Sequence, residues 1–263
     1  MNDREAGVRG SRQKTGLLMQ SMRMTLRDWR AGELRFLLVA LVVAVAALSS
    51  VGFFVDRMRA GLNRDAHQLL GADLVIRADQ PIDGAWREQA RRFGLVMAET
   101  VSFPSMAIAG QGEQTRSQLV SVKAVSPGYP LRGNVKIAAR PDQEGAITRD
   151  IPAPGTIWLD ANLLLSLDVS VGSPVKLGDK TFTAARIVTF EPDRGAGFAN
   201  FAPRVMLSLA DLPATGLVQD GSRVVYRLLA AGDPAQVAAF QKWLQARIET
   251  ENTKGVRLES LES

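Results

Sequence analysis

Carboxylates are the most numerous side chains in this sequence that could do acid–base chemistry. Asp160 and Asp168 form one candidate pair, and Glu191 and Asp193 form another. Either pair could act as acid and base if the fold placed the two groups across a cleft and shifted their pKa values. Nothing in the sequence places them so, and we predict that these four carboxylates lie on the solvated surface.

The single histidine, His67, restricts other kinds of catalysis. One histidine excludes a two-histidine metal site, and a Ser-His-Asp triad would need a G-x-S-x-G serine that the sequence lacks. We predict that His67 is a solvated helix residue. The chain has no cysteine, which removes disulfides, thiolate metal sites and cysteine nucleophiles together. We therefore expect no enzymatic activity, no metal site and no cofactor.

Residues 172–181 (GSPVKLGDKT) have a weak similarity to a phosphate-binding loop. That motif needs G-x-x-x-x-G-K-[ST] between a strand and a helix. Here Asp179 intrudes before the lysine, and the alternating pattern on both sides predicts a hairpin. No helix N-terminus would face a phosphate, so we reject ATP binding by this segment.

Residues 190–204 (FEPDRGAGFANFAPR) form the most unusual segment. Phenylalanines in a glycine-rich loop are unexpected if the loop is only solvated. One interpretation is a contact surface for a partner or an apolar cargo, with Asp193, Arg194, Phe198 and Phe201 as its candidate residues. The other is a loop whose aromatic side chains pack beneath the loop itself.

One uninterrupted apolar run, residues 36–55 (FLLVALVVAVAALSSVGFFV), precedes all of these candidates. It has no charge and no polar stripe, which disfavours a buried helix of a soluble domain. A helix of this length matches the hydrocarbon core of a bilayer. A cleavable secretory signal is the alternative, with residues 44–46 as its cleavage site. We predict a transmembrane helix over residues 36–55.

Residues 1–35 hold eight Lys/Arg and four Asp/Glu, whereas the rest of the chain is nearly balanced. The basic leader therefore indicates membrane contact and not nucleic-acid binding. Its apolar and basic residues fall on two helical faces (Leu18, Met22, Leu26 and Trp29; Arg23, Arg27 and Arg30). This spacing predicts a basic amphipathic helix over about residues 17–34 at an anionic membrane surface, with a solvated tail as the alternative. We expect a cytoplasmic N-terminus and an external large domain.

The elements expected after the run mix helices and strands. We predict a helical stalk over residues 56–72, then a strand–helix–strand unit that ends in a strand pair over residues 96–109, broken near Pro104. A second such unit begins near residue 224, with a helix capped by Asp233. Between the units we expect strands at residues 119–125 and 155–159, a helix at 161–167 and a hairpin at 171–188.

Four blocks of the sequence resemble, in the same order, the start of a YbbP-like permease of the FtsX/MacB-type ABC transporter family. They are residues 26–52, 71–75 (GADLV), 190–204 and 212–216 (LPATG). The resemblance implies an α+β fold, in which one N-terminal transmembrane helix precedes a MacB-like periplasmic domain over residues 73–263. That domain would have a porter-like α/β part built from both ends, about 73–118 and 222–263, and a β-rich insert over about 119–221.

The resemblance also implies a function. A cytoplasmic ABC ATPase subunit would drive motion of the membrane helices, and this motion would reach the periplasmic domain for extraction or handling of lipid-like molecules. Membrane lipid and a periplasmic esterase or lysophospholipase would be further partners, and the location would be the cell inner membrane. The alternative is a single-pass anchored periplasmic interaction module without transport activity.

Family permeases continue beyond the position of Ser263 with further membrane helices. We therefore expect this chain to be a fragment or a truncated gene product, and we expect that it does not couple to ATP hydrolysis by itself.

Overall fold

The computed structural model describes residues 33–194, 202–219 and 221–260, with residues 33–34 and 59–69 described by their backbone alone. The predicted leader helix before residue 33 and the side chains of Phe198 and Phe201 lie outside the described residues. The chain divides into two compact units, residues 1–61 and 62–263.

Helix α2 runs without interruption from Glu33 to Leu70. Residues 35–58 have a mean hydropathy of 2.6, and their large apolar side chains are exposed, as Phe36 and Leu48 illustrate. Within the described part of the chain, this is the one helix long and apolar enough to cross a membrane. The predicted span and stalk are thus one helix, which ends at Gly71 in the left-handed region, with φ of +73°.

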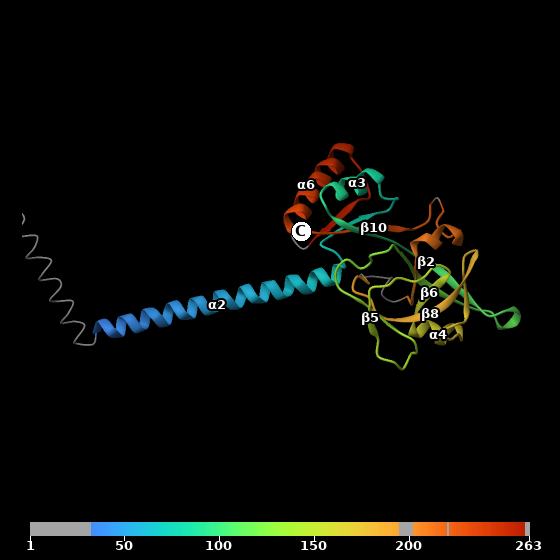
Figure 1. Ribbon diagram of the computed structural model, residues 1–263, viewed down its shortest axis with the longest axis horizontal. Coiled ribbons are helices and arrows are strands. Elements are labelled where there is room, and N and C mark those ends of the chain that lie inside the picture. Colours follow the sequence, from blue (N-terminus) through green and yellow to red (C-terminus); the bar gives the residue numbers. More distant parts are fainter. Residues whose placement is uncertain (1–32, 195–201, 220, 261–263) are drawn as a thin grey trace, which may run out of the picture. The chain divides into compact units, whose positions relative to one another are not determined.

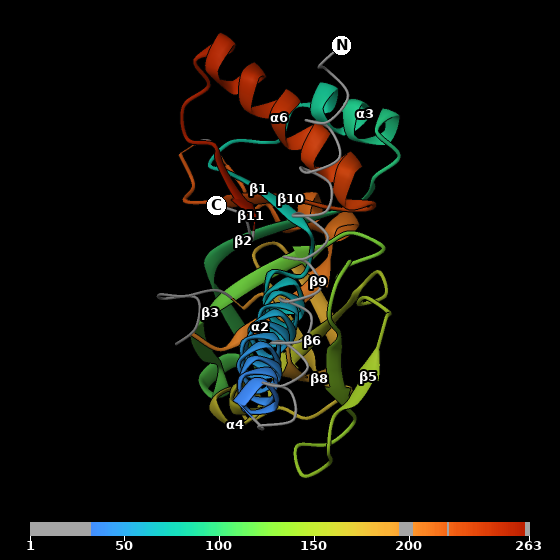
Figure 2. The ribbon, with the colours of Figure 1, turned by 90° about the vertical axis from the view of Figure 1, so that its left-hand side faces the viewer.

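The ends of the second unit form an α/β layer. Its strands pair in the order β11-β1-β10-β2, with each neighbour antiparallel. Helices α3 and α6 lie side by side against this layer (Figures 1 and 2). The elements are β1 (Leu74–Ala78), α3 (Gly84–Arg92), β2 (Val96–Ala109), β10 (Val225–Ala231), α6 (Pro234–Glu251) and β11 (Arg257–Ser260). Two β-α-β units are therefore interleaved in one sheet.

Capping explains where both helices of this layer begin. Asp83 accepts a hydrogen bond from the Ala85 N–H, and Asp233 accepts one from the Ala235 N–H, each at 2.9 Å. Such caps satisfy backbone donors that the first helical turn leaves unpaired. The predicted start of the second helix at Asp233 is confirmed.

The middle of the chain forms a closed barrel. Strands β2, β3, β9, β6, β8 and β7 pair in that order, and β7 pairs again with β2. The added elements are β3 (Arg116–Val125), β6 (Thr156–Asp160), α4 (Ala161–Leu167), β7 (Pro174–Leu177), β8 (Lys180–Phe190) and β9 (Arg204–Ser208), with short helices at Gly112–Gln114 and Leu209–Thr215. Strands β4 (Val135–Ala138) and β5 (Ala146–Thr148) extend the sheet from β8.

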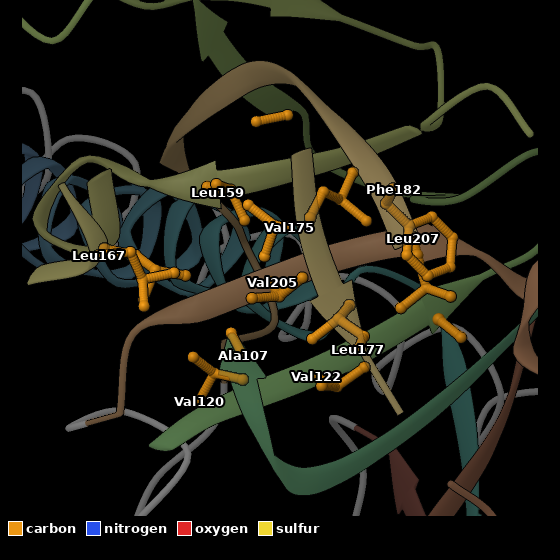
Figure 3. Close-up of a cluster of buried hydrophobic side chains, with 14 of the residues drawn as sticks. Ala107, Val120, Val122, Leu159, Leu167, Val175, Leu177, Phe182, Val205 and Leu207 are labelled. Atoms are coloured by element: carbon orange, nitrogen blue, oxygen red, sulfur yellow. The ribbon is translucent and has the colours of Figure 1, made fainter. Parts of the chain in front are cut away.

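The barrel interior is apolar. Side chains from all six strands point toward one another, and Leu167 of α4 joins them (Figure 3). Val175, Leu177 and Leu207 are fully buried there. Alternation along each strand sends every second side chain inward, so the intervening residues lie on the outer face.

The predicted break near Pro104 is wrong, because β2 continues through it. Pro104 lies opposite Ser121 of β3, and the Ser121 N–H points away from β2 to the Pro203 carbonyl. The nitrogen of Pro104 therefore points away from β3 as well. On the edge of β2 that faces away from β3, pairing with β10 ends at Ser102 and pairing with β7 begins at Ala107. Pro104 lies between these two pairings, so its missing N–H costs no ladder hydrogen bond.

The mixed α/β fold, with strands and helices from both ends of the second unit around a β-rich middle, confirms the predicted fold class. Because β2 belongs to both the layer and the barrel, one continuous sheet joins them. The residue boundaries at 118 and 222 stay predictions.

Candidate functional site: a buried ion-pair network

Most of the candidate carboxylates are buried. Glu191 and Asp193 are each 5% exposed and Asp160 is 9% exposed, so the predicted solvated surface is wrong for these three. Asp168 does lie at the surface, where it pairs with Arg116. The error has a structural cause: the chain turns inward after β8 and brings Glu191 and Asp193 over the outer face of the barrel.

Lys123 is the cation at the centre of this buried group. It lies on β3 between Val122 and Ala124, whose side chains enter the barrel, so its own side chain leaves the barrel on the outer face. The ammonium donates hydrogen bonds to the Tyr129 hydroxyl (2.8 Å), Glu191 Oε1 (2.6 Å) and Asp193 Oδ1 (2.7 Å). These three bonds use all of its donors.

Arg204, the first residue of β9, is the second buried cation. Its Nε donates to Glu191 Oε2 at 2.8 Å, and one terminal nitrogen donates to Ser121 Oγ at 2.6 Å. The other terminal nitrogen reaches the carbonyl of Arg194 at 3.3 Å. Arg204 thus joins the segment that follows β8 to β3 and β9.

Asp160, at the end of β6, also bonds both the segment that follows β8 and the start of β9. It accepts the backbone N–H of Arg204 at 2.8 Å and the guanidinium of Arg194 at 2.6 Å. Residues 194 and 204 both belong to the predicted contact segment, 190–204. Asp160 therefore holds these two residues to the barrel, Arg194 by an ion pair and Arg204 by a backbone hydrogen bond.

Burial and the neighbouring cations shift the pKa of Glu191 in opposite directions. Burial alone would raise its pKa, but Lys123 and Arg204 lower the pKa from 4.5 to about 2. For Tyr129, burial raises the pKa well above 10, and the neighbouring carboxylates of Asp193 and Glu191 add to the increase. The network therefore holds an ionised glutamate beside a neutral phenol, which donates to Asp193 Oδ1.

Asp193 extends the network toward the start of the α/β layer. Its side chain lies against Gly71, where an added Cβ would come within 3.5 Å of the carboxyl carbon. Arg227 of β10 is 3.6 Å from Asp193 Oδ2, which has no hydrogen-bond partner among the described residues. The contact with Gly71 brings the network to the residue that follows α2.

Gly71 and Asp73 are held by a separate set of bonds. Asp73 forms two hydrogen bonds with the guanidinium of Arg132, at 2.7 and 2.8 Å, and accepts the Gly232 N–H at 3.1 Å. The backbone N–H of Arg132 donates to the Gly71 carbonyl at 2.9 Å. Two distant segments of the chain therefore fix the entry to the α/β layer.

This arrangement is suited to holding segments of the chain together. Each buried carboxylate already contacts a cation, and the lysine has no donor left for a substrate. Among the described residues, no group of three or more His, Asp or Glu side chains could hold a metal ion. We define the ion-pair network by its members: Lys123, Tyr129, Asp160, Glu191, Asp193, Arg194, Arg204 and Arg227.

Of the four residues predicted for the contact loop, the structure places Asp193 and Arg194 in the network. Phe198 and Phe201 lie outside the described residues. Sequence reasoning missed Lys123, Tyr129 and Arg227, and it did not name Arg204 within the segment 190–204 that it singled out. Of the three missed residues, only Lys123 gave a signal, as a single charge inside the alternating apolar strand LVSVKAV.

The comparisons with known proteins agree with one another. The family model for the MacB-like periplasmic core domain matches residues 36–247. The ABC transporter permease YbbP of Escherichia coli K12 is 33% identical over 225 residues, which cover 86% of this chain. The chain spans about a quarter of that relative's length, since the match covers 26% of it.

Two solved structures are also similar. The periplasmic region of MacB from Actinobacillus actinomycetemcomitans matches 74% of this chain and 91% of its own, with 10% identity and a TM-score of 0.44. The extracellular domain of the noncanonical ABC-type transporter YknZ from Gram-positive bacteria matches 71% of this chain and all of its own, with 9% identity and a TM-score of 0.45.

Proposed function

This chain belongs to the family of MacB-like periplasmic core domains, and from that membership we propose that it is the amino-terminal part of the permease subunit of an ABC transporter. In this proposal α2 crosses the cell inner membrane, its N-terminal end faces the cytoplasm, and the second unit lies in the periplasm. A separate cytoplasmic ATPase drives the motion, and the chain transmits it without catalysing a reaction.

The observation that carries this proposal is the unbroken helix from the candidate span to the first residues of the domain. Helix α2 continues for twelve residues past Met58 and ends at Leu70, without a loop that would absorb movement. Directly after it, Gly71 and Asp73 are bonded to Arg132 and Gly232. A displacement of the helix end would therefore be passed to these segments.

We further propose that the transmitted motion serves the extraction or handling of lipid-like molecules. Membrane lipid and a periplasmic esterase or lysophospholipase are the partners in this proposal. This proposal rests on what the resemblance of the four sequence blocks to YbbP-like permeases implies, and an apolar helix with exposed side chains is compatible with it.

The test uses the full-length permease with its ATPase, reconstituted in nanodiscs. Ala60 lies in the part of α2 beyond the candidate span. Replacing it by proline interrupts the helix, whereas Ala60→Leu keeps the helix and serves as the matched control. We expect both variants to co-purify with the ATPase, and only the proline variant to lose release of a fluorescent lipid on ATP addition.

The same experiment separates the alternatives. If no ATPase co-purifies with the wild-type permease from membranes, the transporter proposal is wrong and an anchored interaction module becomes the better description. If the proline variant releases lipid as fast as the leucine variant, motion does not pass through α2.

A further inference from the structure

A pocket of about 620 Å³ opens on the outer face of the barrel. Its apolar wall comes from three elements: Ile137 of β4, Trp158 of β6 and Ala185 of β8. Ile151, from the segment between β5 and β6, also lines the pocket and packs against the same apolar cluster. The volume is within the range of small-molecule sites, which combine an apolar lining with a few polar groups.

Two arginines, Arg149 and Arg186, line this pocket. Among the residues that the structure describes, no carboxylate lies within 4 Å of the guanidinium of Arg149 or Arg186. The guanidinium of Arg186 donates to the carbonyl of its neighbour Ala185 at 2.8 Å, its one side-chain hydrogen bond within the described part of the chain. The single carboxylate in the lining, Asp150, is bonded to Thr148. Two guanidiniums and one carboxylate leave a formal charge of +1 around the pocket, which favours a ligand with one negative charge.

One part of the pocket lining, Pro127 and Gly128, is held at both ends by its neighbours in the chain. Pro127 and Gly128 line the pocket, and the next residue is Tyr129, whose hydroxyl lies in the ion-pair network. On the other side, Ser126 Oγ accepts the Glu99 N–H at 2.8 Å. A wall fixed at both ends favours a pocket that exists before a ligand binds, which lowers the entropic cost of binding.

We propose that this pocket binds a free single-chain amphiphile with one anionic head, such as a fatty-acid anion. The apolar chain would lie against Trp158 and Ile137, and the carboxylate would bind Arg149 and Arg186, because guanidinium matches the planar carboxylate. This ligand class deepens the proposed handling of lipid-like molecules, and its biological meaning rests on that function. Binding itself needs no ATPase, so the two proposals can fail separately.

The test measures octanoate binding to the full chain in phosphatidylcholine nanodiscs, with tryptophan fluorescence as the readout. Trp158→Phe identifies the part of the signal that comes from the pocket. We expect the double variant Arg149→Gln/Arg186→Gln to bind octanoate about tenfold more weakly and to bind octanol as the wild type does. Arg140→Gln is the control, because this exposed arginine pairs with Asp142 outside the pocket.

A second variant tests the apolar part. Ala153 lines the pocket and is exposed, so Ala153→Trp fills the space without disturbing the core. We expect it to lose both octanoate and octanol binding at an unchanged melting temperature. Equal octanoate affinity in the wild type and the double arginine variant would overturn the proposal. So would equally tight binding of octylammonium, or binding of anionic bilayers without any binding of soluble octanoate.

Discussion

Replacing Lys123 by methionine removes the cation that Glu191 and Asp193 share while keeping a side chain of similar length. All three side chains are at most 3% exposed. After the change, Glu191 would keep Arg204 at 2.8 Å. Asp193 would keep the Tyr129 hydroxyl and Arg227 at 3.6 Å. One buried carboxylate would thus have no cation within hydrogen-bonding distance.

The magnitude follows from what a buried, uncompensated charge costs. Removing one partner of a buried ion pair destabilises proteins by about 3–5 kcal/mol. For a unit of this size, each kcal/mol lowers the melting temperature by roughly 2–4 °C. We therefore expect Lys123→Met to lower it by about 6–20 °C.

The assay is thermal unfolding of the full chain in nanodiscs, followed by tryptophan fluorescence, because Trp158 packs in the same apolar cluster as Tyr129. Lys176→Met is the matched control, since Lys176 is exposed on β7. We expect the control to change stability by less than about 0.5 kcal/mol. Exposed ion pairs contribute less than about 1 kcal/mol. If Lys123→Met lowered the free energy of unfolding by no more than this, the network would not exclude water, and Lys123 would not be needed to neutralise its carboxylates.

Three further predictions concern pH and backbone conformation. Because the pKa of Glu191 is lowered from 4.5 to about 2, its contribution of about 3 kcal/mol is present above pH 4.5 and is lost as the pH falls toward 2. Urea unfolding across this range should show a smaller acid-dependent loss for Glu191→Gln than for the wild type. The pKa of Tyr129 is raised above 10, so the stability that the neutral phenol provides is complete below pH 10 and declines as the pH rises toward the folded-state pKa. Tyr129→Phe should cost about 1–3 kcal/mol at pH 7, and a cost that does not shrink in unfolding curves above pH 10 would contradict this assignment. Gly178 has φ of +57°, and an added Cβ would collide with the Thr215 carbonyl, whereas Gly172 has φ of +99° and open space. Gly178→Ala should therefore lower the free energy of unfolding by more than about 2 kcal/mol and Gly172→Ala by about 1 kcal/mol, and equal losses would show that the collision is relieved.

Much of the fold could be predicted because local patterns decide it. The helix after Asp233 and the hairpin within residues 171–188 depend on neighbouring residues, and the structure has both. The continuity of β2 through Pro104 could not be predicted in this way. It depends on which strand edge the proline nitrogen faces, and the pairing partners that set this edge are distant in the sequence.

In the candidate site, too, the sequence predicts some features and leaves out contacts between distant residues. The sequence singled out the segment that contains Asp193 and Arg194, because its composition is unusual. It could not show that Glu191 lies beside Lys123, which is 68 residues away. It could not show that Asp160, 44 residues before Arg204, accepts the Arg204 N–H. These partners meet only when β3, β6, β8 and β9 close into a barrel.

The sequence by itself determined the apolar helix, the kinds of elements that follow it and the blocks that resemble the family, since each depends on residue types along a short stretch of chain. Only the tertiary structure decided which charges are buried. From the sequence alone, a carboxylate can only be assigned the solvent exposure that is average for its residue type. Its burial is stabilised only when a cation from another strand is within hydrogen-bonding distance, and barrel closure sets that distance.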